Sequence, residues 1–368
     1  MNFNIPKKDI LETLTVAGKV LPKNGAVPEL ENINLELTGS QLVAKATNLE
    51  VEVISKRDFD TTAALSVLLP PNFMAVVNSL PSSDVSFEFK MNGENSKVLI
   101  TGGAAKFTLG VGNADSYPQV EELSPEGKVL TFTEKELREI VGQAVVCVSA
   151  DESRPVFQAV AFDFGQDKFE VLASDTYRLS RRIEELPYGD RDIALVPGKS
   201  LEELIRLLGN GESSVSMFYQ NNRVVFKGEK FYFAARVITE KFPDISGVIP
   251  GEHKTQAILP VKELTEAVKR VALISEGKNR AIKLTLDKDG LHLFAESQMG
   301  EANERLEFKQ KEGEDVELHI NARFLLDAVS VAAGENVRLC LNGSAGPVVI
   351  YNAEDNNWLC LILPVKMN

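Results

Sequence analysis

The sequence predicts an α+β protein of three similar domains, in which antiparallel strands pack against amphipathic helices. The chain has 368 residues, 44% hydrophobic and 25% charged, which suits two to three globular domains. A threefold internal repeat starts at Phe3, Leu130 and Ala257, with starts 127 residues apart. Apolar and polar residues alternate in the strand-like segments of every copy, as half-buried strands require.

Each copy begins with a short strand, a break of one or two residues and an amphipathic helix pattern. The three stretches are FNIPKKDILETLTVAGKVLP, LTFTEKELREIVGQAVVCVS and AILPVKELTEAVKRVALIS. Alternating strand pairs follow, with turns at Thr38-Gly39, Gly165-Gln166 and Asp289-Gly290. In the second copy, apolar residues at helical spacing predict one buried face of the helix: Leu137, Ile140, Val141, Ala144 and Val145.

The same plan recurs at half scale inside each copy. A second strand and helix are read in VLLPPNFMAVVNSL, ALVPGKSLEELIRLL and LHINARFLLDAVSVA, and more hairpin material follows each of them. The smallest unit is therefore a β-α-β-β-β segment of about sixty residues that occurs six times. Acidic connectors containing Pro and Gly, around 124–128 and 249–254, predict domains at 1–123, 129–248 and 255–368.

Charge and cysteine content limit the class of protein. Lys and Arg number 40 against 53 Asp and Glu, a net charge of −13, so contact with nucleic acid would need a local basic lining. Basic residues lie on the polar faces of the predicted helices, although mixed charge is common on solvated helices. The three cysteines, Cys147, Cys340 and Cys360, stand far apart in apolar runs and are expected to be buried free thiols. With no signal-peptide pattern and no long apolar run, a cytoplasmic location is expected.

The sequence contains no recognisable catalytic or metal-binding pattern. A phosphate-binding loop, a nucleophile elbow and paired C-x-x-C motifs are all missing. His253, His292 and His319 lack a common metal-ligand spacing. Ser174-Asp175 with Arg178 could suggest catalysis, but its place at the end of a strand favours a turn. We therefore expect no catalytic residue, no metal and no cofactor.

Several stretches taken together resemble the bacterial DNA polymerase III beta subunit family, the sliding clamps. They are Ala173-Ser174-Asp175-Thr176-Tyr177-Arg178-Leu179, Lys241-Phe242-Pro243-Asp244, Glu335-Asn336-Val337-Arg338 and Leu363-Pro364-Val365-Lys366-Met367. The resemblance covers the whole chain and implies the DNA clamp fold, with antiparallel sheets outside and helices lining a ring. It also implies a non-catalytic processivity factor, a head-to-tail homodimer that encircles duplex DNA and tethers DNA polymerase III.

By the same resemblance, basic residues on the lining helices and their loops would contact phosphates without reading sequence. These residues are Lys19, Lys23, Lys135, Arg138, Arg154, Lys199, Lys269, Lys278 and Arg280. Lys23 meets the family pattern only approximately. The dimer seam would bring Phe107 and Leu109 against Leu273 and Ile274.

The family also carries a hydrophobic pocket that accepts a short peptide from polymerase III alpha, the clamp loader delta subunit and other clamp-motif proteins. Its residues here would be Phe157, Ser174, Thr176, Tyr177, Arg178, Leu179, Pro243, Val248, Asn321, Phe324, Ala345, Pro347, Ile362, Leu363, Pro364, Val365 and Met367. Gly247 stands where relatives commonly have arginine, and Asn368 extends past the usual terminus, so peptide preference is open. Leu179 and Val248 could equally be core residues.

Two other classes remain open at this stage. An enzyme using Asp175 and Arg178 would turn over a substrate, and loss of Asp175 would abolish that activity. A repeat scaffold that binds proteins but not DNA would tolerate charge reversal at Lys199 and Arg138.

Overall fold

The computed structural model describes residues 1–22, 27–61, 64–188, 192–277 and 280–366. The chain forms two compact units, which are treated separately. The first contains Met1–Leu137 and Lys199–Val237, and the second contains Arg138–Gly198 and Ile238–Asn368. The predicted second domain thus contributes to both units, and its sequence boundaries stay a prediction.

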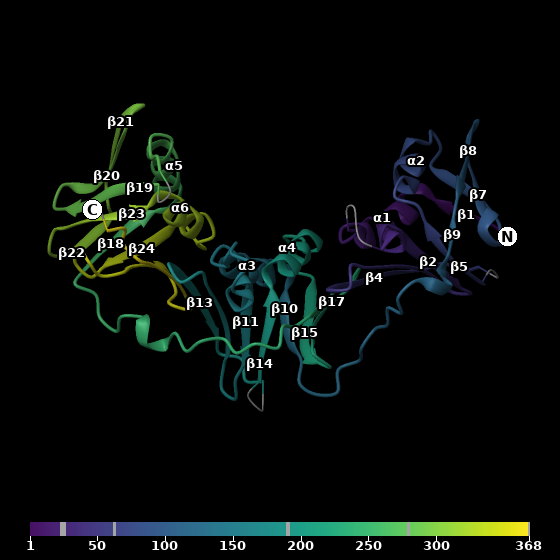
Figure 1. The fold of residues 1–368 in the computed structure, drawn as a ribbon, viewed down its shortest axis with the longest axis horizontal. Coiled ribbons are helices and arrows are strands. Elements are labelled where there is room, and N and C mark those ends of the chain that lie inside the picture. The colour runs from purple at the N-terminus through teal and green to yellow at the C-terminus, as the bar shows by residue number, and fades with distance from the viewer. Residues whose placement is uncertain (23–26, 62–63, 189–191, 278–279, 367–368) are drawn as a thin grey trace. The chain divides into compact units, whose positions relative to one another are not determined.

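Six α-helices occur in the described part of the chain, one in each predicted half-unit (Figure 1). They are α1 (Lys7–Gly18), α2 (Phe73–Ser79), α3 (Glu134–Val145), α4 (Gly198–Leu207), α5 (Val261–Ala272) and α6 (Ala322–Ser330). Pro6, Pro197 and Pro260 end the strands before α1, α4 and α5, where a residue without an N–H stops strand pairing and begins a helix. Before α3, Thr133 and Glu136 form a capping box, with Thr133 N–H donating to Glu136 Oε2 over 2.7 Å.

The first unit contains two antiparallel sheets. The four-stranded sheet has the order β1 (Asn2–Pro6), β6 (Asp84–Lys90), β7 (Lys97–Gly102) and β8 (Ala105–Gly110). The nine-stranded sheet has the order β10 (Leu130–Thr133), β15 (Ser214–Gln220), β16 (Arg223–Lys227), β17 (Tyr232–Arg236), β4 (Val51–Asp58), β3 (Gln41–Thr47), β2 (Ile33–Thr38), β5 (Ala64–Leu69) and β9 (Gly112–Asn113).

The second unit repeats this arrangement. Its nine-stranded sheet has the order β14 (Asp192–Pro197), β11 (Ala159–Phe164), β12 (Phe169–Ser174), β13 (Arg178–Glu184), β26 (Trp358–Ile362), β25 (Val348–Asn352), β24 (Asn336–Leu341), β18 (Thr255–Pro260) and β22 (Gln310–Gly313). Its four-stranded sheet has the order β21 (Gly300–Leu306), β20 (Gly290–Ser297), β19 (Ala281–Asp287) and β23 (Val316–Asn321).

The first strand of each half-unit pairs with the strands of the other half. Thus β1 joins β6–β8, whereas β5 joins β2–β4, and the same exchange recurs in the later repeats. A second kind of pairing links successive repeats: β4 pairs with β17, and β13 pairs with β26. No half-unit can therefore satisfy its own strand edges, which explains why the halves occur in pairs.

The helices pack their apolar faces onto these sheets. In the second unit, α5 and α6 pack side by side and contact strands of both sheets (Figure 1). The predicted stripe of α3 is confirmed for Leu137, Ile140, Val141 and Ala144, which are almost fully buried. Val145 is only half-buried, because it lies in the last turn at the margin of the stripe. The three cysteines are buried and free, as predicted.

Candidate peptide-binding, DNA-facing and dimer residues

The end of β12 forms a tight turn, 174–178, that carries several of the predicted peptide-binding residues. The Ser174 hydroxyl donates to Arg178 O over 2.8 Å and accepts from Thr176 N over 3.1 Å. Asp175 Oδ1 accepts from the backbone N–H groups of Tyr177 and Arg178, both at 2.9 Å. These bonds hold Thr176 at a φ of 76°, a left-handed conformation that few non-glycine residues adopt.

Arg178 is held from three directions on the side of the sheet that faces α6. Its Nε donates to Asp175 over 2.9 Å, and its Nη1 donates to Asp327 of α6 over 2.7 Å. Its guanidinium lies 4.3 Å from the centre of the Phe324 ring, a cation–π contact. Burial acts to lower the pKa of Arg178, but the bond to Asp327 and the nearby negative charges raise it above its ordinary value. Arg178 is therefore a permanently charged anchor for the turn.

The C-terminal residues complete this region. After β26, Leu363 N donates to Tyr177 O over 2.9 Å, and Val365 N donates to His319 O over 2.8 Å, which returns the chain to β23. The two residues joined by the first of these bonds expose large apolar side chains, Tyr177 at 64% and Leu363 at 43%. Asn321 caps α6 by accepting from the N–H groups of Arg323 and Phe324. The turn, the C-terminal segment and the start of α6 thus meet.

The predicted peptide-binding residues do not all lie on this side of the sheet. Leu179 follows Arg178 in β13 and so points to the opposite face. There it is 3% exposed and packs with Leu361, Ile245 and Ile249. For Leu179 the core interpretation is therefore the one that its contacts support.

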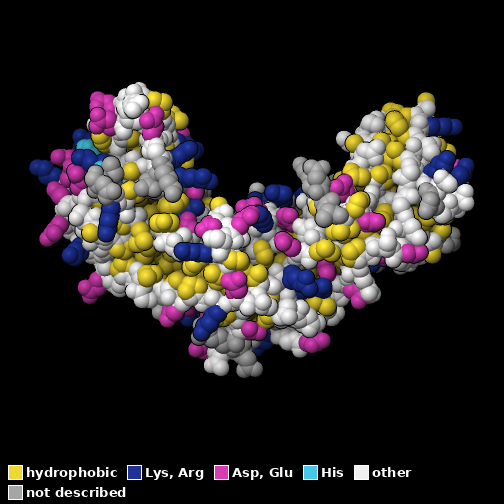
Figure 2. All heavy atoms as spheres, viewed as in Figure 1, with side chains coloured by type: hydrophobic (Ala, Val, Ile, Leu, Met, Phe, Trp, Pro, Cys, Tyr) yellow, Lys and Arg dark blue, Asp and Glu magenta, His cyan; other side chains and the backbone are white. Residues whose placement is uncertain are grey.

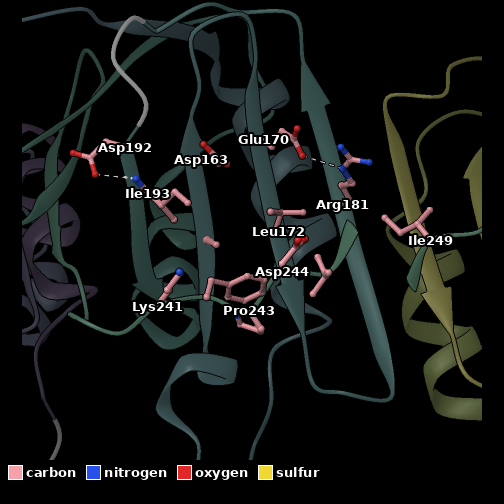
Figure 3. Close-up of a pocket in the computed structure, with 13 residues that line it drawn as sticks. Asp163, Glu170, Leu172, Arg181, Asp192, Ile193, Lys241, Pro243, Asp244 and Ile249 are labelled. Atoms are coloured by element: carbon pink, nitrogen blue, oxygen red, sulfur yellow. Dashed lines mark hydrogen bonds and ion pairs between the residues drawn. The ribbon is translucent and has the colours of Figure 1, made fainter. Parts of the chain in front are cut away.

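A pocket of about 690 Å³ lies on that opposite face, over β11–β14 (Figure 3). Leu172, Ile193 and Pro243 give it apolar walls, and Pro243 is the one predicted peptide residue among its described lining. At one side of it, Arg181 of β13 donates to Glu170 of the neighbouring strand β12 over 3.0 Å (Figure 3). Burial acts to raise the pKa of Glu170, but hydrogen bonds from Arg181 and Lys168 lower it below its ordinary range.

The remaining predicted peptide residues have varied surroundings. Val248, at the end of a 3₁₀ turn (Ser246–Val248), is 56% exposed, Ala345 is exposed, and Ile362 is buried within β26. The half-buried ones are Phe157, Pro347, Pro364 and Val365. Met367 and Asn368 lie outside the described residues. At Gly247 a Cβ would meet no atom within 4 Å, so space does not explain why arginine is replaced there.

Sequence reasoning missed Asp327 as part of this region. Its partner Arg178 lies 149 positions away, so no local pattern joins the two residues. Asp175 and Arg178, considered above as a catalytic pair, bind each other and fix the turn. Among the described residues no cluster of His, Cys, Asp and Glu could hold a metal ion.

The predicted DNA-facing residues stand at helix ends and in adjoining loops. Lys135 and Lys199 are exposed second residues of α3 and α4, and Lys19 follows α1, where its Nζ donates to Arg206 O over 2.5 Å. In the second unit Arg138 is half-buried, whereas Arg154, Lys269 and Arg280 are exposed. Lys269 pairs with Glu266 over 2.9 Å. Lys23 and Lys278 lie outside the described residues.

Basic and acidic side chains are interspersed on the face shown in Figure 2. The helices share this mixture, since α1, α3, α4, α5 and α6 all carry acidic as well as basic residues. Each helix therefore offers separate basic positions instead of a surface of one sign.

The predicted dimer residues lie near sheet edges. Phe107 and Leu109 belong to β8, the last strand of the four-stranded sheet in the first unit, and Phe107 is 39% exposed. Leu273 and Ile274 directly follow α5 in the second unit, and Leu273 is 73% exposed. Helix α5 packs beside β21, the end strand of its own four-stranded sheet.

These features define a class of protein: paired β-α-β-β-β units with six helices and antiparallel sheets are the fold of the DNA clamps. Models of the N-terminal, central and C-terminal domains of the DNA polymerase III beta subunit match residues 1–121, 131–244 and 246–366. The chain belongs to the DNA polymerase III beta subunit family.

Relatives match along the full length of the chain. It is 27% identical to the beta sliding clamps of Streptococcus pneumoniae strain R6 and Bacillus subtilis strain 168, with 100% of each chain covered. Among solved structures, the Bacillus subtilis clamp superposes with a TM-score of 0.91 and the griselimycin-bound Pseudomonas aeruginosa clamp with 0.90. Each is 25% identical, with 100% of both chains covered. No helix in the described part of this chain is long and apolar enough to span a membrane.

The turn at 174–178 has an internal counterpart in the first unit at 47–51. There Thr47 Oγ1 donates to Val51 O over 2.7 Å, and Asn48 Oδ1 accepts from the N–H groups of Glu50 and Val51. Leu49 has a φ of 74°, as Thr176 has 76°. Arg236 N donates to Glu50 O, just as Leu363 N donates to Tyr177 O. The two turns therefore make the same hydrogen bonds. They differ in that the first has Val51 at the position that Arg178 occupies in the second.

With valine in place of the arginine, Glu203 has no ion-pair partner at the corresponding place in the described part of the chain. Glu203 is the sixth residue of α4, as Asp327 is of α6. Its Oε2 is buried and has no hydrogen-bond partner among the residues that the structure describes. Burial raises the pKa of Glu203 to about 7, with Arg206 opposing the rise and the charges of Glu50 and Glu202 adding to it.

We predict that Glu203→Gln stabilises the protein at pH 8 more than at pH 5. Because the folded-state pKa, about 7, lies above the ordinary value of 4.5, the stabilisation from protonated Glu203 is complete below 4.5 and is lost as pH rises through 7. Partial exposure reduces the effect, so a gain of roughly 2 °C in Tm at pH 8 is expected by thermal denaturation. Glu212→Gln, at an exposed residue of the same unit that does not act on Glu203, serves as the control. Equal gains at both pH values would contradict this assignment.

Proposed function

We propose that this chain is the replicative sliding clamp of its cell, a ring-shaped homodimer that encircles duplex DNA and holds DNA polymerase III on its template. The observation that carries the proposal is the sixfold β-α-β-β-β repeat together with membership of the beta subunit family. The sliding clamp is a non-catalytic subunit of the polymerase III complex. A clamp acts by encircling DNA, so it needs binding interfaces and no reactive group. We place it in the cytoplasm, where replication takes place.

Ring closure would join apolar residues of the end strand β8 to the apolar residues that follow α5. Phe107 and Leu109 of one copy would meet Leu273 and Ile274 of another in a head-to-tail contact. Such a contact joins two different surfaces, and closing it into a ring avoids an open filament. Opposite charges on the two end strands support this orientation, because β8 carries Lys106 and β21 carries Glu301. Closure would also protect strands whose outer edges are otherwise open.

The contacts with DNA would be weak and independent of sequence. Lys135 and Lys199 at helix ends could reach phosphates, as could the other basic residues predicted above. The acidic residues on the same helices limit the strength of attraction, and the net charge of −13 discourages binding elsewhere. A ring that slides needs contacts that position it without holding it at one sequence.

Partner proteins would dock through a short peptide beside the 174–178 turn. We propose that the partners include the alpha subunit of polymerase III and the delta subunit of the clamp loader. Tyr177, Val248 and Leu363 expose apolar surface suited to a peptide's hydrophobic anchors. Arg178 would position the turn and would not be a direct contact, since it is only 8% exposed.

The test of the proposal is retention on DNA of defined topology. The protein is loaded onto nicked circular DNA by the cognate clamp loader and ATP, and retention is followed before and after the circle is linearised. We expect the protein to stay on circles and to leave linear DNA by sliding off its ends. Retention that ignores the ends and falls only with salt would identify an ordinary polyanion ligand. If the loader is active on a reference clamp but does not load this protein, a protein-binding scaffold would be favoured.

We predict that the double variant Leu273→Ala, Ile274→Ala opens the ring into monomers. Removing both side chains deletes the apolar contact offered by the residues that follow α5, and small apolar interfaces depend on a few such anchors. Analytical ultracentrifugation should show the wild-type dimer and a monomeric variant at micromolar concentration. Val248→Ala, at an exposed apolar residue of the same unit that lies away from β21, is the control and should remain dimeric. An unchanged dimer in the double variant would rule out this seam.

For the peptide site, we predict that Tyr177→Ala and Leu363→Ala each weaken peptide binding about tenfold. Each removes an exposed anchor that costs about 1.4 kcal/mol when truncated. Fluorescence anisotropy with a labelled peptide from the cognate alpha subunit measures the affinity, and Met299→Ala, at an exposed apolar residue outside the predicted peptide site, serves as control. Undiminished affinity in both variants would show that the peptide binds elsewhere.

A further inference from the structure

Two of the three cysteines lie next to each other in the core of the second unit. The sulfur atoms of Cys147 and Cys360 are 3.8 Å apart, although the residues are 213 positions apart in the sequence. Both side chains are fully buried. The third cysteine, Cys340, is equally buried but has no sulfur partner among the described residues. The chain therefore contains one pair of neighbouring buried thiols, and one equally buried single thiol that can serve as an internal control.

One cysteine stands inside a sheet and the other in a turn after a helix. Cys360 lies in β26, where it pairs with Ser180 of β13 on one side and Ile350 of β25 on the other. Cys147 lies just beyond α3, in a turn where its N–H bonds to Ala144 O over 3.0 Å. A small shift of this turn could shorten the sulfur separation toward the 2.05 Å of a disulfide while the sheet stays in place.

The internal repeat shows that thiols are not needed at this place for packing. Val20 follows α1 as Cys147 follows α3, and its N–H makes the same bond to Ala17 O. Register across the paired strands places Phe233 of β17 where β26 has Cys360. Val20 and Phe233 are both buried and apolar. Ordinary hydrophobic residues thus fill the equivalent position in the first unit.

We propose that Cys147 and Cys360 form an oxidative modification site, at which a small disulfide or diazene oxidant joins them into one disulfide bond. The bond would connect the second predicted domain to the last strand of the third. In a reducing cytoplasm the pair stays reduced, so the cross-link belongs to oxidative stress.

The chemistry balances with a diazene dicarboxamide such as diamide as oxidant. One thiolate adds to the N=N bond, and the second thiolate then attacks the sulfur so captured. The S–S bond forms, the S–N bond breaks, and the two protons and two electrons leave on the hydrazine product. The hydrogen bond to Cys360 and burial raise the pKa of Cys147 well above its ordinary value, so the reaction waits for the turn to open.

The full-length protein is incubated with diamide, unfolded and alkylated, and its thiols are counted by mass spectrometry. We expect the three thiols of the wild-type chain to fall to one, with peptide mapping placing the bond between Cys147 and Cys360. Cys340→Ser should still form the bond. Cys147→Val, which copies the residue found at position 20, should fold normally and form none. The cross-linked protein should melt higher by on the order of 5 °C.

Three results would overturn the proposal. One is the survival of all three thiols in protein incubated with diamide at pH 8.5 in urea just below the unfolding transition. Another is a bond that involves Cys340, and the third is a bond between two chains in place of one within a chain. Thermal denaturation with and without reductant verifies that any gain in Tm comes from the disulfide.

Discussion

The exchange of first strands between half-units is the constraint on which the rest of this structure depends. Each half-unit has three strands in sequence after its helix, and its first strand completes the sheet of the other half. Backbone N–H and C=O groups in a sheet need partners, so neither half is complete without the other. The same rule acts between repeats, where β4 pairs with β17 and β13 with β26. The turns at 47–51 and 174–178 stand directly beside these two junctions.

The two turns show how a repeated backbone acquires a specialised site. Thr47 and Ser174 make the same hydroxyl bonds, and Leu49 and Thr176 share one left-handed backbone conformation. Only the second turn has an arginine, which binds acids on both sides and stacks on an aromatic ring. Beside the first turn, the corresponding acid of α4, Glu203, has no such partner among the described residues. The shared hydrogen bonds give the two turns the same backbone shape, and a few side chains make the two sites different.

The pairing of Arg178 with two carboxylates also explains why this conspicuous polar group need not be catalytic. Both Asp175 and Asp327 are already committed to the guanidinium. What remains accessible beside them is apolar surface, from Tyr177 and Leu363. Polar groups that are already paired, next to exposed apolar side chains, suit a docking surface better than a reaction centre.

The sequence by itself determined the repeat, the helix and strand types, the buried helix faces and the family, because these depend on local periodicity and short motifs. It also pointed to the turn at 174–178 and to buried cysteines. Tertiary structure alone decided which strands pair. It also brought together Asp327 and Arg178, and Cys147 and Cys360, which are far apart in the sequence and share no local pattern. Alternation along a strand already puts Leu179 and Arg178 on opposite faces, but only the tertiary structure decided that the face with Leu179 is buried. The roles proposed for the basic residues and the seam require a second copy and DNA, whose contacts are decided by assembly.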